Sequence, residues 1–308
     1  MVKDAFYVDG QSRSFGGFQK DFSNADFVLF GVPYDSTSTF RPGSRFGPRL
    51  IRDVSSNLET WSWRTGIDYE EIKLHDLGDL AVVHGDSMET LRRISETVED
   101  IAGSRKIPVM IGGEHMVTLG AVRALKDVMV VTFDAHFDLR EEYLTNRLSH
   151  ACVMRRITEE VGASNLIEVG PRATYREELE FVKQKGINYI SSLDIMRSAP
   201  QTMASWLRDR LREAKRVYVS VDIDVLDPAY APGVGNPEPE GISTTALLDL
   251  LNTAVDDRLV GFDVVEVCPP CDNGSTAAVG SKLIFEICSM VQASRRAAEG
   301  AESRERRR

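Results

Sequence analysis

The chain has 308 residues, of which 42% are hydrophobic and 27% are charged, as in ordinary soluble globular proteins. Its net charge of -10 argues against nucleic acid as the main partner, because phosphate binding needs a basic surface, and suits metal cations and a cationic substrate. No stretch offers the roughly 18 consecutive apolar residues of a membrane span, and residues 1–15 lack the apolar core of a signal peptide. We therefore expect a cytoplasmic protein with no membrane partner.

Strand-like and helix-like segments alternate along the chain. Apolar runs that predict buried strands occupy residues 27–32, 109–111, 128–133, 166–169, 217–221 and 260–267. Helical periodicity lies between them, over residues 88–102, 151–160, 176–184, 204–214, 245–255 and 277–293. Buried strands separated by helices indicate a parallel sheet covered on both faces, hence a three-layer α/β/α fold. Without internal repeats or a flexible linker, residues 1–308 are expected to form one domain, with a solvated or frayed charged tail over about 297–308.

The four cysteines are too few for a disulfide framework in a chain of this length. Cys268 and Cys271 form a CxxC around two prolines, but no second CxxC completes a zinc site. We expect the cysteines to be packing residues in a reducing compartment.

Three of the apolar runs end in clusters of carboxylates and histidines, at the end of the strand where parallel sheets bind ligands. The residues concerned are Glu114 and His115 after the second run, Asp134, His136 and Asp138 after the third, and Asp222, Asp224 and Asp227 after the fifth. Residues two apart in an extended segment point to one face, so the members of each cluster can converge.

These clusters supply two imidazoles and four carboxylates as candidate metal ligands. A lone Asp at a strand end usually caps the next helix, and a lone buried His is usually a core residue. Three such clusters at one edge of a sheet are hard to explain by capping, because gathered carboxylates repel each other unless a cation neutralises them. The set is large enough for two divalent ions if some carboxylates bridge, and mixed oxygen and imidazole ligation suits Mn²⁺.

The combined motifs resemble the three signatures of the ureohydrolase family, which includes arginases and agmatinases. They occupy residues 112–115, 134–140 and 220–228, and residues 41–52 resemble an agmatinase N-terminal signature. The resemblance extends from about residue 27 to residue 287 and implies an arginase-like fold whose central, mostly parallel sheet has about eight strands. It also implies two Mn²⁺ ions per chain and an assembly of three or six copies.

The resemblance implies a role for each matching residue. One ion would be held by His115, Asp134, Asp138 and Asp222, and the other by Asp134, His136, Asp222 and Asp224. His150 resembles the family's proton-shuttle histidine, and Glu266 its substrate-binding glutamate, which can take two N–H bonds from a planar guanidinium. Ser243 aligns with a threonine near the shuttle, and Asp227 with a structural aspartate.

The reaction implied is hydrolysis of a guanidino group to urea and an amine, with agmatine, and hence putrescine and polyamine biosynthesis, as the first candidate. The arginase pattern that binds an α-amino acid is absent, and residues 149–156 and 170–172 resemble agmatinase forms. Glu141 or Glu142 is predicted to meet the distal amine of agmatine. Arg140 could instead pair with a substrate carboxylate, as in guanidinobutyrate, and Glu240 adds an acidic group of unknown effect.

Other readings are weaker. Arginase and guanidinobutyrase activities remain the alternatives within the family. A catalytically silent metal-binding scaffold would show a lost ligand, yet His150, Glu266 and all the ligands are present. A single-zinc deacetylase would need a tandem-histidine base, which Glu114 and His115 do not supply.

Overall fold

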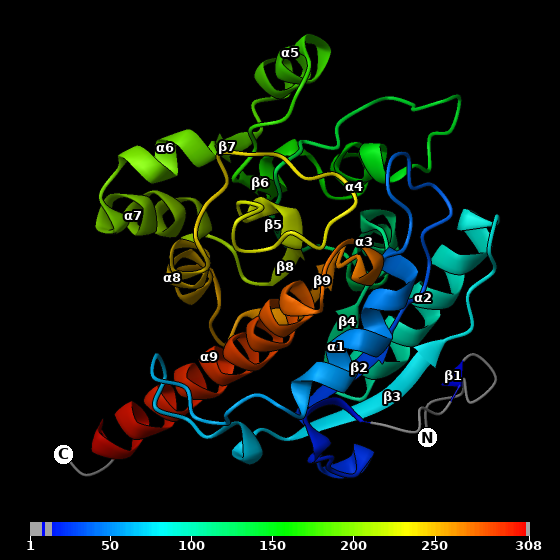
Figure 1. The fold of residues 1–308 in the computed structure, drawn as a ribbon. Helices are drawn as coiled ribbons and strands as arrows, with labels where there is room; N and C mark the ends of the chain where they lie inside the picture. The colour runs from blue at the N-terminus through cyan, green and yellow to red at the C-terminus, as the bar shows by residue number, and fades with distance from the viewer. Residues whose placement is uncertain (1–7, 10–13, 306–308) are drawn as a thin grey trace.

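A nine-stranded sheet forms the centre of the computed structural model, which describes residues 8–9 and 14–305 (Figure 1). Its spatial order is β1-β3-β2-β4-β9-β8-β5-β6-β7. The strands are β1 (Val8–Asp9), β2 (Phe27–Gly31), β3 (Leu74–Leu80), β4 (Ile107–Ile111), β5 (Met129–Phe133), β6 (Leu166–Val169), β7 (Asn188–Ile190), β8 (Val217–Asp222) and β9 (Leu259–Val265). Strands β2 to β9 pair in parallel and β1 pairs antiparallel with β3, so the predicted mostly parallel sheet is confirmed.

Helices cover both faces of the sheet. One face carries α1 (Gly47–Ser55), α6 (Ser192–Arg197), α7 (Pro200–Leu211), α8 (Thr244–Ala254) and α9 (Ser275–Glu305). The other face carries α2 (Ser87–Gly103), α3 (Thr118–Leu125), α4 (Val153–Val161) and α5 (Arg176–Lys185). The three-layer α/β/α architecture expected from the alternating pattern is therefore confirmed, whereas the single-domain organisation stays a prediction.

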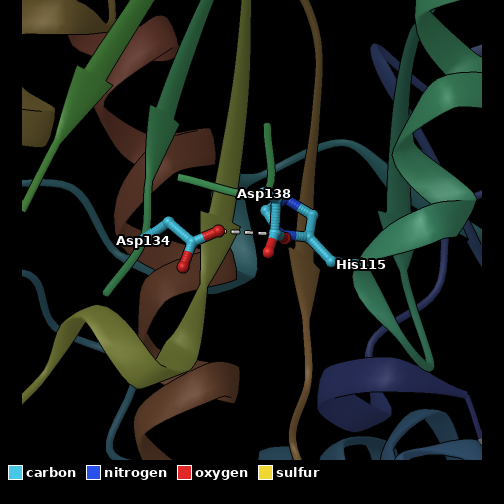
Figure 2. A group of neighbouring side chains, drawn as sticks. All are labelled: His115, Asp134 and Asp138. Atoms are coloured by element: carbon cyan, nitrogen blue, oxygen red, sulfur yellow. Dashed lines mark ion pairs between the residues drawn. The ribbon is translucent and has the colours of Figure 1, made fainter. Parts of the chain in front are cut away.

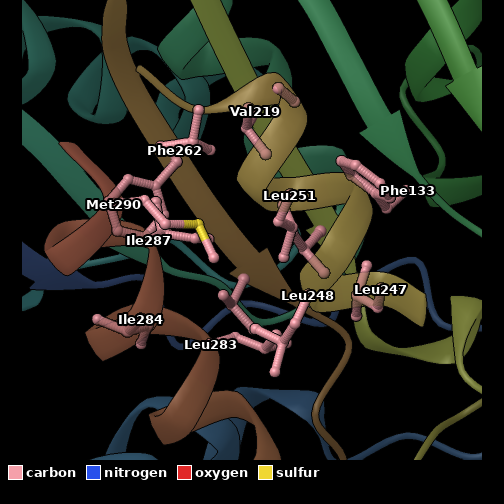
Figure 3. Packing of buried hydrophobic residues seen from close by; sticks show 14 of the residues in the cluster. Phe133, Val219, Leu247, Leu248, Leu251, Phe262, Leu283, Ile284, Ile287 and Met290 are labelled. Carbon is pink, nitrogen blue, oxygen red and sulfur yellow. The ribbon is translucent and has the colours of Figure 1, made fainter. Parts of the chain in front are cut away.

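The larger of the two cores lies between the sheet and the pair α8 and α9 (Figure 3). Leu251 of α8 and Ile287 of α9 are fully buried beside Phe262 of β9. Full burial of one such aliphatic side chain contributes roughly 1.5–3 kcal/mol. This packing holds the centre of the sheet, and with it the strand ends that carry the polar clusters.

A buried ion pair attaches α1 to β3. The side chain of Arg52 is 1% exposed, and its guanidinium donates to both oxygens of Asp76 at 2.8 and 2.9 Å. A third bond, of 2.5 Å, reaches Asp79. In β3 the leucines recur only at every third position, among a histidine, two acids and a glycine. Neither an apolar run nor a strict alternation therefore marks this strand, and we did not predict it.

The C-terminal segment differs in part from the expectation of a frayed tail. Helix α9 continues to Glu305, and residues 296–300 are exposed on it, so this charged stretch is solvated but helical. Residues 306–308 lie outside the described part of the chain. Most of residues 1–15, which are expected not to form a signal peptide, lie outside it as well. Of the helices described, none is at once long and apolar enough to cross a membrane.

Candidate metal centre and substrate pocket

The polar clusters meet at the carboxyl ends of the central strands. His115 begins a 3-10 turn after β4, Asp134 follows β5, and Asp222 ends β8. Parallel strands bring these ends to one edge of the sheet, the usual ligand-binding edge of such folds. The sequence folds this way because each apolar run is buried as a strand, and the polar residues that follow the run leave the sheet in a turn.

The first group of ligands surrounds the imidazole of His115 (Figure 2). Its Nδ1 lies 2.9 Å from Oδ2 of Asp134, 3.3 Å from Oδ2 of Asp138 and 3.4 Å from Oδ2 of Asp222. These are the four residues that the family resemblance assigns to one ion.

The second group surrounds His136. Its Nδ1 lies 3.1 Å from Oδ2 of Asp224 and 3.5 Å from Oδ1 of Asp134. The two oxygens of Asp134 therefore face different histidines, as a bridging carboxylate would. Asp222 lines the same cavity as the second group.

Two buried atoms in these groups fit a metal ion. Nδ1 of His115 and Oδ2 of Asp134 have no hydrogen-bond partner among the described residues, although leaving buried polar atoms unpaired is costly. The other ring nitrogen of His115 lies 3.0 Å from the Ser220 hydroxyl, which donates to Asp263 at 2.6 Å. This arrangement puts the ring proton on Nε2 and leaves Nδ1 free as a ligand, as at many metal-binding histidines.

The pKa values in the metal-free protein show how strongly the groups interact. Burial, followed by the charge of Asp134, raises the pKa of Asp138 to about 7, and burial also raises that of Asp222 well above its usual range. Burial lowers the pKa of His115, but its acidic neighbours outweigh burial and hold it well above the ordinary value. Protons thus neutralise the cluster in part, which is the role that cations would otherwise fill.

Two of the site's acids have a strained backbone. Asp138 has φ of 50° and Glu266 has φ of 63°, in the left-handed region that non-glycine residues seldom adopt. Such strain costs on the order of 1–3 kcal/mol and is concentrated at functional sites. It indicates that surrounding contacts fix where both carboxylates point.

Glu266 and His150 lie next to each other above the metal ligands. Oε1 of Glu266 accepts a 2.8 Å bond from the His115 amide and lies 4.0 Å from Nδ1 of His150. Nε2 of His150 lies 3.1 Å from the Thr39 hydroxyl. Burial, followed by the charges of the two ligand histidines, lowers the pKa of His150 to about 4, so its imidazole is neutral at pH 7.

A cavity of about 630 Å³ opens above these groups. His150 and Glu266 line this cavity together with four of the candidate metal ligands, and Arg140 and Glu238 line it as well. The guanidinium of Arg140 lies over the rings of Tyr143 and Tyr175, 4.8 and 4.4 Å from their centroids. No carboxylate among the described residues lies within ion-pair distance of Arg140.

Other predicted substrate residues do not reach this cavity. Glu141 pairs with Arg147 and Arg155 at 2.8 and 2.6 Å, and these arginine charges lower its pKa against the effect of burial. Glu142 is exposed and does not line the cavity. The expectation that one of these two acids meets a substrate amine is thus unsupported by the geometry.

Ser243 caps a helix instead of facing the shuttle. Its hydroxyl accepts a 3.2 Å bond from the Ala246 amide at the start of α8, and it is absent from the lining of the cavity. Glu240 is exposed with φ of 63°. Asp227 accepts bonds from the amides of Ala229 and Gly241 at 3.0 Å each, which agrees with the expected structural role.

Several residues that shape the site were not predicted. Asp263 anchors the bond from Ser220, and Thr37 donates to buried Glu114 and accepts from the His150 amide at 2.9 Å. Arg172 donates to five backbone carbonyls of residues 224–226 and 238–239 and so ties together two loops of the cavity. Two of these residues carried a signal in the sequence: Asp263 is an acid inside an apolar run, and Arg172 belongs to the segment 170–172 that resembles agmatinases. Thr37 stands in an ordinary polar segment.

Comparisons with known proteins agree with this fold and site. The profile described as the Arginase family matches residues 25–289. An N(1)-aminopropylagmatine ureohydrolase from Thermococcus kodakarensis is 39% identical, with 85% of this chain and 89% of the relative covered. An agmatinase from Bacillus anthracis is 36% identical, with 86% and 92% covered. The crystal structure of an agmatine ureohydrolase from Thermoplasma volcanium has a TM-score of 0.87 and 36% identity, covering 94% of this chain and 97% of that one.

Fold, site and relatives define the class as hydrolases that act on guanidino C–N bonds. The chain belongs to the arginase family, and it is of the arginase/agmatinase ureohydrolase type. The resemblance inferred from the motifs alone is thereby confirmed.

Proposed function

We propose that this protein uses two Mn²⁺ ions to hydrolyse a guanidino compound to urea and an amine, and that agmatine is its first candidate substrate. The observation that carries the proposal is the pair of ligand groups joined through Asp134, with Glu266 and His150 directly above them. Agmatine is favoured by the names of the agmatinase and the agmatine ureohydrolase that are each 36% identical to this chain. The proposal includes a cytoplasmic role in polyamine biosynthesis.

The residues present suit two ions of mixed oxygen and nitrogen preference. His115, Asp134, Asp138 and Asp222 would hold one ion, and His136 and Asp224 would hold the other with the two bridging aspartates. Bound metal ions of this kind activate water as a nucleophile at neutral pH.

Glu266 is placed to orient the guanidinium. One of its oxygens is already fixed by the His115 amide, and its backbone strain fixes the direction of the side chain. Burial and the charge of Glu114 raise the pKa of Glu266 well above the usual range, so the carboxylate needs a cationic partner. A substrate guanidinium would supply that charge together with two parallel N–H donors.

His150 is placed to hand a proton to the leaving amine. Its neutral imidazole faces the cavity. The Thr39 hydroxyl bonds to the ring, and the Thr37 hydroxyl accepts a bond from the backbone amide of His150. A neutral imidazole can accept a proton during attack and return it when the C–N bond breaks.

A second candidate substrate is a guanidino acid such as 4-guanidinobutyrate. Arg140 presents an ion-pair-free guanidinium on the cavity wall, stacked on Tyr143 and Tyr175. An arginine fixed in this way matches a carboxylate at the distal end of a substrate and repels an amine. Glu178 and Glu238, two acids that also line this cavity, favour the amine instead.

The test is urea release by Mn²⁺-loaded protein with agmatine, arginine and 4-guanidinobutyrate in parallel. We expect agmatine to have the highest kcat/KM, and Asp134→Ala to abolish the activity. The variant Arg140→Gln separates the two candidate substrates. Loss of the cation should raise kcat/KM for agmatine. It should lower kcat/KM for guanidinobutyrate by roughly tenfold, the equivalent of about 1.4 kcal/mol. Absence of urea from all three compounds, with two metal ions bound, would refute the proposed substrate class.

The family resemblance also leads us to propose a homotrimer or homohexamer. Light scattering on the eluting protein would measure this directly, and a monomer would contradict it.

A further inference from the structure

The CxxC segment after β9 lies beside the candidate active site. Cys268 is fully buried and stands two residues after Glu266, whereas Cys271 is partly exposed. Their sulfur atoms are 3.1 Å apart. A disulfide has an S–S distance of about 2.05 Å, so a movement of about 1 Å would join them.

The local backbone holds the two thiols in this position. Cys268 and Cys271 bracket a 3-10 turn, in which the Cys271 amide donates a 2.9 Å bond to the Cys268 carbonyl. The residues between them, Pro269 and Pro270, each have a fixed φ. Closing a ring across so restricted a turn loses little chain entropy.

A metal-binding role does not suit this pair. The groups of three or more ligands found among the described residues contain neither cysteine. Two thiols alone do not complete a zinc site. A thiol pair at this spacing, with one member accessible and the other buried, suits oxidation instead.

The pair also touches the loop that holds the proposed proton shuttle. The Cys268 sulfur lies 3.9 Å from the Arg41 carbonyl and 3.8 Å from that of Pro42. This loop, residues 35–43, carries Thr39, whose hydroxyl bonds to His150. Moving the Cys268 sulfur towards Cys271 would withdraw it from the loop and displace the segment that follows Glu266.

We propose that Cys268 and Cys271 form a reversible intramolecular disulfide that couples the redox state of the protein to the geometry of its substrate pocket. The oxidant is a small-molecule disulfide. The Cys271 thiolate attacks one of its sulfurs and releases one thiol, giving a mixed disulfide on Cys271. The Cys268 thiol then loses its proton and attacks the Cys271 sulfur, which releases the second thiol and completes the protein disulfide. Two protein thiols are oxidised and one small disulfide is reduced to two thiols.

Mass spectrometry tests the disulfide itself without any reference to activity. The folded, Mn²⁺-loaded protein is equilibrated in glutathione buffers from fully reduced to fully oxidised, alkylated and digested with trypsin. Residues 259–282 form one tryptic peptide that contains both cysteines of the pair and no other. We expect this peptide to escape alkylation and lose two hydrogen atoms as the buffer becomes oxidising, and to return to the doubly alkylated form after reduction.

Two variants make the assignment specific. Cys271→Ser should leave the activity of the reduced protein unchanged and should abolish the disulfide-containing form of the peptide. Cys288→Ala, which removes a buried cysteine in α9, should still form the disulfide-containing peptide. The proposal would be overturned if the wild-type peptide stayed alkylated on both cysteines in the most oxidising buffer. It would also be overturned if, at the same potential, the disulfide formed in an unfolded sample and not in the folded protein.

The coupling to the pocket rests on the proposed function, so it has its own readout. Oxidised wild type should show a several-fold lower kcat/KM for the preferred guanidino substrate, restored by a phosphine reductant, and Cys271→Ser should not respond. A closed disulfide with unchanged kcat/KM would overturn the coupling. If no guanidino compound is hydrolysed, the proposed function fails, while the peptide masses still decide the disulfide.

Discussion

At the scale of single residues, the hydrogen bonds behind the ligands matter as much as the ligands. His115 is oriented by Ser220, which is oriented in turn by Asp263. Asp263 also accepts bonds from Thr118 at 2.9 Å and Tyr218 at 2.6 Å. This buried network orients the ring of His115 before any metal binds, with Nε2 towards Ser220 and Nδ1 towards the acids.

Replacing Ser220 by alanine tests this network. We expect Ser220→Ala to weaken metal binding by about 10–100-fold, because His115 loses the partner that orients its ring. The measurement is a calorimetric titration of the metal-free protein with Mn²⁺. Thr132→Val is the matched control: Thr132 pairs with Ser220 across β5 and β8, and its buried hydroxyl has no partner among the residues described, so its loss should leave affinity unchanged. Equal effects of both changes would contradict the role of Ser220.

The depressed pKa of His150 predicts a pH dependence of stability in the metal-free protein. The unfolded histidine takes up a proton near pH 6.5, whereas the folded one does so only near pH 4. The unfolded state therefore binds more protons between these values, and the free energy of unfolding falls as the pH drops through this window. At pH 5.5 the loss is about 1 kcal/mol relative to pH 7.5.

Urea denaturation of wild type and His150→Asn, both treated with a chelator, measures this effect. Between pH 7.5 and pH 5.5, the free energy of unfolding of the wild type should fall by about 1 kcal/mol more than that of the variant. A difference that stays constant with pH would mean that His150 has an ordinary pKa.

The candidate site was readable from the sequence to the extent that its residues follow buried strands. Asp134 and Asp222 come straight after apolar runs, and parallel strands make their positions converge. Glu141 was chosen because its charge suited the substrate, whereas its ion-pair partners Arg147 and Arg155 could be identified only from the folded loop. Contacts made by Thr37 and Arg172 cross more than 50 residues and leave no local pattern.

At the scale of secondary-structure elements, the strongly apolar segments were predicted and the mixed ones were not. All six predicted strands exist within a few residues of the expected bounds, and all six predicted helices exist. Helix α7 begins four residues earlier than expected, at Pro200, and α9 continues twelve residues beyond the expected end, to Glu305. Strands β1, β3 and β7 and helices α1, α3 and α6 were missed. In β3, buried and half-buried residues alternate, and buried Asp76 is paired with Arg52 of another element and accepts bonds from the amides of Phe15 and Gly78.

That interaction makes Arg52 important for the attachment of α1. We expect Arg52→Met to lower the free energy of unfolding by about 3–5 kcal/mol, because it leaves Asp76 buried without its partner. Arg49→Met on the same helix is the control: Arg49 is 82% exposed and lies 3.9 Å from Asp53, so its loss should cost less than about 1 kcal/mol. Urea midpoints of the two variants give the comparison, and similar midpoints would show that the buried pair contributes little.

At the scale of the whole molecule, the net charge of -10 and the buried acids predict that bound cations stabilise the folded state. Metal ions that bind the folded protein alone stabilise it by about 2.7 kcal/mol at a concentration 100 times the Kd. For a chain of this size, we expect Mn²⁺ to raise the Tm of chelator-treated protein by about 5 °C or more.

Thermal unfolding with and without Mn²⁺ checks this expectation. Asp134→Asn should show almost no metal-dependent rise, because both ligand groups use Asp134. A rise of the same size in wild type and Asp134→Asn would place the stabilising ions elsewhere on the protein.

The order of the strands also constrains when the site can form during folding. Strand β9 is the last in the chain, yet it lies between β4 and β8, which carry His115 and Asp222 (Figure 1). On a ribosome, the segments up to β8 emerge with a gap at the middle of their sheet, and residues 259–265 must then be inserted between two existing neighbours. Contacts between such distant segments form slowly. We therefore expect both groups of candidate ligands to become rigid only after β9, which Glu266 directly follows, has been inserted between β4 and β8.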